Sequence, residues 1–300
     1  MRGKYIRLIV YGVVALGGFG YSFYKEYFSI VGITGIVLIL AEFCLGQFLN
    51  NVKDFFVGTG WKNSLKALQQ RGIVKEDDYI RISFAYLFRI KIGDRYFLVK
   101  NERGTQKYQP VGGAYKFQEI EKKYLKKEFS PKDDMGIKID EKSKNDYRMY
   151  VRAKYLKKFI KRFDKTPYRE QINDLSREIK EELCLTCNSV FNNISYRYCG
   201  RHFTEIEYSR VFRCYELLLA DIVELNLSEA QERYLNNLVT FQTNKFMLTT
   251  VQKIKSCGIE AGTENLLENI ADHTIKILQE TEPDLIKIRK YMKNDYTINI

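Results

Sequence analysis

Apolar residues are concentrated in the first fifty positions of the chain, in two stretches separated by a short polar break. Residues 8–24 carry no charged side chain, the break is Lys25 and Glu26, and residues 27–49 carry only Glu42 as a charged residue. A helix needs about 20 apolar residues to cross a bilayer. The pattern therefore predicts a transmembrane helical hairpin over residues 1–50.

Two other interpretations of this segment are weaker. A secretory signal peptide would explain the basic start of the chain, but a second and longer apolar stretch does not usually follow it at once. A helical hairpin buried in a soluble core would normally show a polar stripe on each helix. These two stretches show almost none.

Basic side chains flank both ends of the predicted hairpin. They are Arg2, Lys4 and Arg7 before it and Lys53, Lys62, Lys66 and Arg71 after it. Because an excess of positive charge stays on the cytoplasmic side, we expect both termini in the cytoplasm. The expected localisation is the inner membrane, as a multi-pass protein embedded in the lipid bilayer.

Beyond the hairpin, the pattern changes to that of a mixed α/β domain. Residues 51–78 predict a linker helix. Residues 79–92 are rich in aromatic and β-branched side chains, Gly93 and Asp94 mark a turn, and residues 95–100 return as a second strand. Further strands are expected over residues 190–198 and 206–220, and helices over 228–239, 245–256 and 263–280. The predicted fold class is α/β, with an α/β/α sandwich over residues 79–300 after the hairpin and linker.

Three glutamates share one side of a helix predicted within residues 167–185. Glu178, Glu181 and Glu182 stand at positions i, i+3 and i+4, so their carboxylates converge. Such a cluster repels itself unless a cation joins it, and Mg²⁺ or Mn²⁺ prefers oxygen ligands of this kind. Most strings of this composition are ordinary charged surface helices, so the pattern by itself leaves both interpretations open.

The net charge of the chain indicates which kinds of partner it binds, and its cysteine content indicates the redox state of its compartment. The formal charge is +12, which favours nucleotide phosphates, nucleic acid or an acidic lipid surface without choosing among them. The six cysteines form no regular framework, so we expect reduced thiols. Cys184 and Cys187 form a lone C-x-x-C, and with only two histidines in the chain a structural zinc site is the weaker interpretation.

The charged helix and the glycines before it resemble the box of the Nudix hydrolases. That box reads G, five residues, E, seven residues, then R-E-U-x-E-E-x-G-U, where U is aliphatic. Gly113 and Glu119 match its first half, and residues 177–185 match its second half with Cys184 in place of the glycine. Fifty-seven residues separate Glu119 from Arg177 instead of seven. The insertion covers about residues 120–166. The whole interval from residue 120 to residue 176 carries seventeen basic and ten acidic residues.

The Nudix resemblance implies a site made from both halves of the box. Metal ligands would be Glu178, Glu181 and Glu182, with Mg²⁺ or Mn²⁺ as the cofactor. Gly112, Gly113 and Arg177 would contribute to ligand binding, and Glu181 and Glu182 would be the catalytic residues of an active enzyme. The long insertion and Cys184 disfavour catalysis more than binding, because catalysis tolerates little displacement of the metal.

The order of the segments resembles the two-transmembrane Nudix effectors of bacterial CBASS antiphage systems, whose remaining part is a SMODS-associated Nudix-like domain. The resemblance implies that the domain binds a cyclic oligonucleotide second messenger made by a cyclic-oligonucleotide synthase. Homo-oligomeric hairpins would then disrupt the inner membrane and cause abortive infection. The alternative functions are a membrane-tethered Nudix pyrophosphohydrolase of nucleotide derivatives and a membrane scaffold with an inactive Nudix fold.

Overall fold

The computed structural model describes two units of the chain, residues 1–63 and 64–300. The described residues of the first unit are helical at 11, 13, 14, 16, 17 and 42–45 and continue from residue 60. From residue 60 on, the structure describes residues 60–102, 104–134, 136, 140, 143–183, 189–259, 268–278, 285–292 and 295–299. Helix α3 (Trp61–Gln70) lies within the predicted linker.

The helices that the structure describes do not support the predicted transmembrane hairpin. The predicted multi-pass membrane localisation, which depended on that hairpin, is corrected with it. None of the described helices is both long and apolar enough to cross a bilayer. The longest, α7 (Glu229–Phe241), has 13 residues, well short of the length a bilayer requires. Most of residues 1–50, on which the prediction rested, lie outside the described residues. The fold class of the described residues is mixed α/β.

The larger sheet has the spatial order β12-β8-β10-β1-β7-β6, with β5 also paired to β1 and β9 to β10. Its strands are β1 (Tyr79–Arg89), β5 (Gly112–Ala114), β6 (Lys132–Asp133), β7 (Arg148–Arg152), β8 (Asn193–Phe203), β9 (Glu207–Ser209), β10 (Cys214–Asn226) and β12 (Tyr296–Asn299). The two long central strands, β1 and β10, run parallel, and the other pairs are antiparallel. Strand β1 is buried along most of its length, which explains its nearly continuous apolar sequence.

Two buried arginines lie on β1 opposite glutamates of β10. Arg81 is paired in register with Glu216, and Arg89 with Glu224. The ion-pair distances are 2.9 Å for Arg81 Nη1 to Glu216 Oε2 and 3.0 Å for Arg89 Nη1 to Glu224 Oε2. A shift of one residue would separate both pairs and reverse the faces of every side chain, so these contacts favour the observed register.

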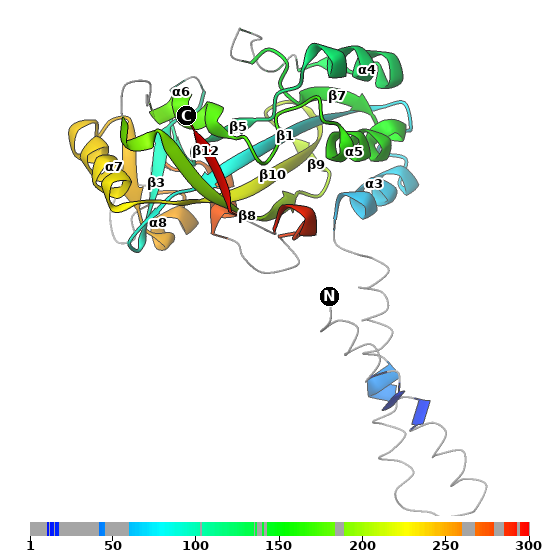
Figure 1. Ribbon diagram of the computed structural model, residues 1–300. Helices are drawn as coiled ribbons and strands as arrows, with labels where there is room; N and C mark the ends of the chain where they lie inside the picture. Colours follow the sequence, from blue (N-terminus) through cyan, green and yellow to red (C-terminus); the bar gives the residue numbers. More distant parts are fainter. Residues whose placement is uncertain are drawn as a thin grey trace, which may run out of the picture. The chain divides into compact units, whose positions relative to one another are not determined.

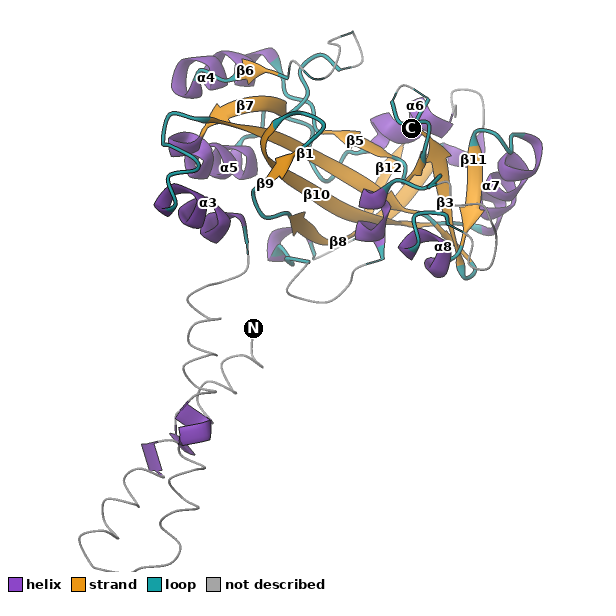
Figure 2. Ribbon diagram, turned by 180° about the vertical axis from the view of Figure 1, so that it is seen from behind, coloured by secondary structure: helices purple, strands orange, loops and turns teal. Residues whose placement is uncertain are grey.

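A smaller antiparallel sheet lies at one end of the domain, together with two helices (Figure 1). Its strands are β2 (Lys91–Ile92), β3 (Arg95–Lys100), β4 (Tyr108–Gln109) and β11 (Phe246–Thr249), in the order β11-β3-β2 with β4 on β3. Helices α7 and α8 (Val251–Lys255) lie at this end (Figure 2). The predicted hairpin turn at Gly93 and Asp94 is confirmed between β2 and β3. The helix predicted from residue 228 is confirmed as α7, which begins with a capping box formed by Ser228 and Gln231.

The insertion contributes two strands, β6 and β7, to the larger sheet. It contains α4 (Glu119–Phe129), β6, β7, a short 3₁₀ turn at Ala153–Tyr155 and α5 (Leu156–Lys165). Strand β7 pairs with the first half of β1, and β5 pairs with its second half, on the same edge. In both ribbon views α4 and α5 lie beside β7, at the opposite end from α7 (Figures 1 and 2).

Aromatic side chains attach α5 to the sheet. Phe159 and Phe163 of α5 are fully buried, and their ring centroids lie 6.1 and 4.8 Å from that of Phe84 on β1. Tyr147, next to β7, and Tyr115, next to β5, contact Phe163 at 5.0 and 5.2 Å. Burying large aromatic rings in this way is a principal source of core stability. The insertion thus shares a core with β1.

A buried ion pair, extended by a further carboxylate, connects β8, β10 and α5. Arg201 of β8 is 1% exposed, and its guanidinium contacts both carboxylate oxygens of Asp221 on β10, at 2.7 and 2.8 Å. Tyr115 and Tyr198 donate hydroxyl hydrogen bonds to the same carboxylate. Asp164 of α5 binds the remaining side of Arg201 at 2.6 Å. Both carboxylate oxygens of Asp221 therefore accept hydrogen bonds from Arg201 and from a tyrosine hydroxyl, as a buried charge requires.

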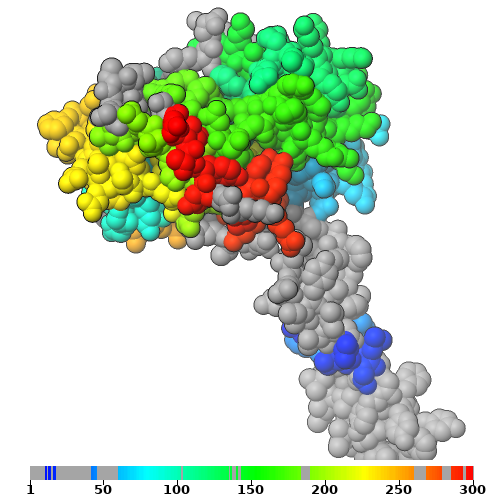
Figure 3. Space-filling view, in the orientation of Figure 1, coloured from blue at the N-terminus to red at the C-terminus, as the bar shows by residue number. Residues whose placement is uncertain are grey.

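The C-terminal residues close one edge of the larger sheet. Strand β12 pairs with β8, and Ile286 exchanges backbone hydrogen bonds with Arg201. In the space-filling view these residues (red) lie on the surface between the part containing α7 (yellow) and the part containing α5 (green) (Figure 3).

Candidate functional site

The charged helix is shorter than the sequence pattern predicts. Helix α6 runs from Ser176 to Leu183, and the preceding residues are irregular or strand-like. Gln118 donates a backbone hydrogen bond to Tyr168, and Glu170 donates one to Lys116. Residues 168–170 are thus paired with residues 116–118 and cannot be helical. Cys184, the residue in the glycine position of the box, lies outside the described residues.

The paired glycines lie directly against the glutamates of α6. Gly112 and Gly113 belong to β5, opposite Leu87 and Tyr86 of β1. A Cβ atom at Gly113 would overlap the carboxylate of Glu178. A Cβ at Gly112, where φ is +155°, would overlap the backbone oxygen of Tyr86. At Gly112 only glycine fits, because the obstructing atom belongs to the backbone of β1. At Gly113 a larger residue would require the Glu178 side chain to move.

Arg177 contacts most of the charged residues of the site. Its guanidinium contacts Glu178 at 2.5 Å, Glu181 at 3.5 Å and Glu170 at 3.2 Å. It also donates to the backbone oxygen of Ala114 at 3.0 Å, which connects α6 to the end of β5. Gly112, Gly113, Arg177 and the three glutamates are therefore brought together. The chain holds the two halves of the box side by side although the insertion separates them in sequence.

Glu170 is the acidic partner of Arg177 that sequence reasoning missed. Its carboxylate accepts hydrogen bonds from Arg177 Nε (3.2 Å), from the Tyr86 hydroxyl (3.0 Å) and from the Lys116 backbone N–H (3.3 Å). Glu119, which the spacing from Gly113 had suggested, contacts instead Asn145 at 3.3 Å and Lys122 at 3.6 Å. Counting back from Arg177 finds Glu170 with six intervening residues, close to the seven of the box. The insertion therefore precedes the acidic residue that pairs with Arg177.

Glu182 carries the most perturbed carboxylate of the three. The side chain as a whole is partly buried, but its Oε2 atom is fully buried and has no hydrogen-bond partner among the described residues. Burial, with added repulsion from Glu178, raises the pKa of Glu182 to about 8, although the Gly112 N–H donates to it. Burial also raises the pKa of Glu178, against the effect of Arg177. Both carboxylates are thus poorly solvated, and the loss of water around an acid disfavours its charged form.

The profile of the SMODS-associated NUDIX domain family matches residues 79–278. The chain belongs to this family. The match ends near the last residue of a 3₁₀ segment, Asp272–Ile277, and includes both sheets except β12. As a SMODS-associated NUDIX domain, residues 79–278 form a Nudix-type domain linked to CBASS.

Other comparisons add little to the family assignment. No curated protein matches the SMODS-associated NUDIX chain. One similar solved structure is a bifunctional NMN adenylyltransferase/ADP ribose pyrophosphatase from Francisella tularensis, at 10% sequence identity and a TM-score of 0.26. The alignment covers 85% of this chain and 56% of that chain. A likeness at this level carries no argument about activity.

The side chains of this SMODS-associated NUDIX domain fit a divalent metal in chemistry, and Nudix-type hydrolases generally use such metals. The donor set is three carboxylates, and the buried Oε2 of Glu182 is an oxygen that a cation would satisfy. As arranged, however, no three acidic, histidine or cysteine side chains among the described residues are positioned to hold one ion. Glu178 and Glu181 instead form ion pairs with Arg177.

The raised pKa of Glu182 predicts how stability depends on pH. Its pKa is about 8 in the folded chain and 4.5 ordinarily, so the folded state binds this proton more tightly. The resulting stability is fully present below about pH 4.5 and is lost as the pH rises through about 8. In metal-free buffer we expect the melting temperature of the full chain to fall over this window. The Glu182→Gln variant should show a flatter profile.

Thermal unfolding followed by circular dichroism in the presence of EDTA measures this dependence. Glu181→Gln is the matched control, since it removes the same charge from a more exposed position of α6 and should follow the unmodified chain. Parallel profiles for the unmodified chain and Glu182→Gln would show that Glu182 does not titrate in this range.

Proposed function

We propose that the Nudix-type domain is the sensor of a CBASS system and binds a cyclic oligonucleotide second messenger. The observation that carries this proposal is the match of residues 79–278 to the SMODS-associated NUDIX family. A cyclic-oligonucleotide synthase would supply the ligand. The net positive charge of the insertion and of the whole chain supports a polyanionic ligand of this kind.

Binding is favoured over hydrolysis by the arrangement of Arg177. Its guanidinium holds Glu178 and Glu181, two of the three carboxylates that a Nudix enzyme would direct to metal. In this proposal Gly112 and Gly113 allow the backbone to approach the ligand closely, and Arg177 can contact a phosphate. Mg²⁺ or Mn²⁺, held by Glu178, Glu181 and Glu182, would neutralise phosphate charge. The membrane step that the sequence suggested is not part of the proposal, because no described helix supports it.

Titrating the full chain with a panel of cyclic di- and trinucleotides, by isothermal calorimetry with and without Mg²⁺, tests the proposal. We expect saturable binding of at least one member and its recovery intact by liquid chromatography after prolonged incubation. A linear dinucleotide of the same bases is the matched control and should bind at least tenfold more weakly, since it has more conformational freedom to lose. The proposal is wrong if no cyclic member binds, or if linear and cyclic ligands bind equally.

The second candidate is a metal-dependent pyrophosphohydrolase of nucleotide derivatives. The observation that favours it is Glu182, whose pKa of about 8 suits a group that exchanges a proton near neutral pH. Divalent metal would activate water and neutralise the pyrophosphate. If this candidate is right, Mg²⁺-dependent turnover of a nucleoside diphosphate derivative will fall at least a hundredfold in Glu181→Gln and Glu182→Gln. Absence of turnover in the unmodified chain excludes it for that substrate.

A further inference from the structure

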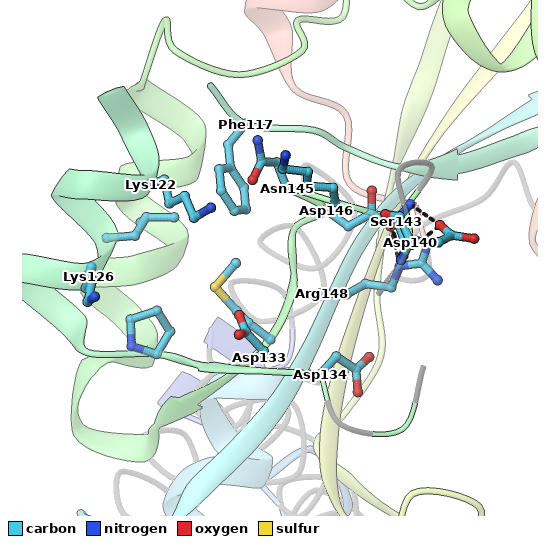
Figure 4. Close-up of a pocket in the computed structure, with 14 residues that line it drawn as sticks. Phe117, Lys122, Lys126, Asp133, Asp134, Asp140, Ser143, Asn145, Asp146 and Arg148 are labelled. Carbon is cyan, nitrogen blue, oxygen red and sulfur yellow. Dashed lines mark hydrogen bonds and ion pairs between the residues drawn. The ribbon is translucent and has the colours of Figure 1, made fainter. Parts of the chain in front are cut away.

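A cavity of about 510 Å³ lies within the insertion, apart from the three glutamates of α6. It is bounded by α4, by the strand-like residues that follow β5, and by the segments on either side of β6 and β7. Figure 4 shows Phe117 and Lys122 directed toward the same space, with Asp133 below them and Asp146 and Arg148 on the far wall. The volume falls within the range of pockets that hold small molecules.

The wall formed by α4 is basic. Lys122 and Lys126 both line the cavity and stand four residues apart, so they project from one side of the helix. Lys122 is half exposed, and its acidic neighbour Glu119 lies at 3.6 Å, a weak surface contact. Lys126 is also exposed. Two ammonium groups one helical turn apart can bind the oxygens of a phosphate group.

The buried acidic residues of the cavity are already neutralised. Asp146 is held by Lys116 and by Arg148, both at 2.5 Å. Asp134 is held by Arg81 at 2.7 Å. The lysines of α4 therefore face walls whose buried carboxylates have their charge compensated. Asp133 is exposed and can accept hydrogen bonds from amino groups of a base.

The cavity also has an apolar wall suited to a flat ring. Phe117, Leu125, Pro131 and Met149 line it beside the charged groups. Phe117 is partly exposed and contacts Tyr147 edge-on, at 5.1 Å between ring centroids. Because Tyr147 is fully buried, it supports the Phe117 ring from the core side. An aromatic ring beside ammonium groups is the combination that binds nucleotides by stacking and charge.

One short segment connects this cavity to the Nudix box. The backbone N–H of Lys116 donates to Glu170, the partner of Arg177, while its ammonium group binds Asp146 on the cavity wall. The next residue, Phe117, donates its backbone N–H to Asn145 at 2.9 Å. Residues 115–118 thus lie between residues 145–147 on one side and 168–170 on the other.

We propose that this cavity binds one nucleotide unit of the anionic ligand, with the phosphate at Lys122 and Lys126 and the base against Phe117. The inference rests on the proposed function and adds the place in the domain where the ligand is recognised. Ligand contacts at Phe117 reach Arg177 through Lys116 and Glu170.

The test compares two charge reversals on the same helix. Lys122→Glu/Lys126→Glu changes the cavity wall, and Lys123→Glu/Lys127→Glu makes the same change in net charge at exposed positions of α4 outside the cavity lining. Calorimetry of the full chain with the cyclic di- and trinucleotide panel, in EDTA at constant ionic strength, gives the affinities. We expect the first variant to bind at least tenfold more weakly and the second to stay within threefold of the unmodified chain. Circular dichroism confirms that both variants fold.

A second measurement separates this inference from the proposed function. Acetylation of exposed lysines, read by mass spectrometry, should show that the bound cyclic nucleotide protects Lys122 and Lys126 but not Lys123 and Lys127. Binding with protection elsewhere, or equal weakening by the two double variants, overturns the cavity assignment and leaves the proposed function standing. Absence of binding to the unmodified chain overturns both. Phe117→Ala should weaken binding severalfold, and an unchanged affinity would remove the base from this position.

Discussion

Replacing Arg201 with alanine is expected to lower the free energy of unfolding by about 3–5 kcal/mol, the cost typical of removing one partner from a buried ion pair. Asp221 is 0% exposed and would keep only the hydroxyls of Tyr115 and Tyr198 as partners. Asp164 would lose its contact with β8 as well. Because these groups come from α5, β8, β10 and the end of β5, the variant should lose stability across the whole domain.

The control for this prediction lies on the same two strands. Arg197 of β8 pairs with Glu224 of β10 at 3.1 Å, but the arginine side chain is 57% exposed. Arg197→Ala should cost about 0–1 kcal/mol, because water replaces much of what an exposed pair provides. Urea unfolding of the full chain, followed by tryptophan fluorescence and circular dichroism, measures both. Equal losses for the two variants would contradict the importance of burial at Arg201.

Gly113→Ala is expected to destabilise the chain by about 1–3 kcal/mol, the usual cost of overpacking. The new methyl group would overlap the carboxylate of Glu178, which is also held by Arg177. Glu178 must therefore move, and the affinity for Mn²⁺ should fall by about 10–100-fold, as when the support of a metal ligand is lost. Urea unfolding gives the stability, and Mn²⁺ titration followed by electron paramagnetic resonance gives the affinity.

The double variant Gly113→Ala/Glu178→Ala identifies the cause. Truncating Glu178 removes the atoms that the methyl group would meet, so Gly113→Ala should be nearly neutral in that background. A cycle of this kind isolates the interaction between the two positions. If Gly113→Ala costs the same with and without the Glu178 side chain, the close approach of β5 and α6 is not what requires glycine.

Local sequence signals predicted the parts of the fold that depend on neighbouring residues. Residues 95–100 form β3 as expected, because Gly93 permits a turn with a φ of +60° between two runs of aromatic and β-branched residues. The start of α7 follows from Ser228 and Gln231, whose side chains satisfy each other's backbone groups. These signals need no tertiary contact to be read.

Predictions that depended on distant contacts were less accurate. Residues 246–249 were expected to be helical but form β11, because Phe246 stacks on Phe97 and the segment pairs with β3. The parallel pairing of β1 with β10 leaves no trace in either strand alone. Within the site, the motif located the glycines and the glutamates. Glu170 was missed because its role depends on how residues 168–170 pair with residues 116–118.

The parallel pairing of β1 with β10 has a consequence for synthesis of the chain. Arg81 and Glu216, its first pair, are 135 positions apart, so the centre of the larger sheet cannot form until the ribosome has made the chain as far as β10, which ends at Asn226. At about 5–20 residues per second, that interval lasts on the order of ten seconds. Throughout it, the backbone N–H and C=O groups on the edge of β1 toward β10 have no native partner. A nascent chain with this topology is therefore a natural client for holding chaperones, and overexpression at low temperature should increase the yield of folded protein.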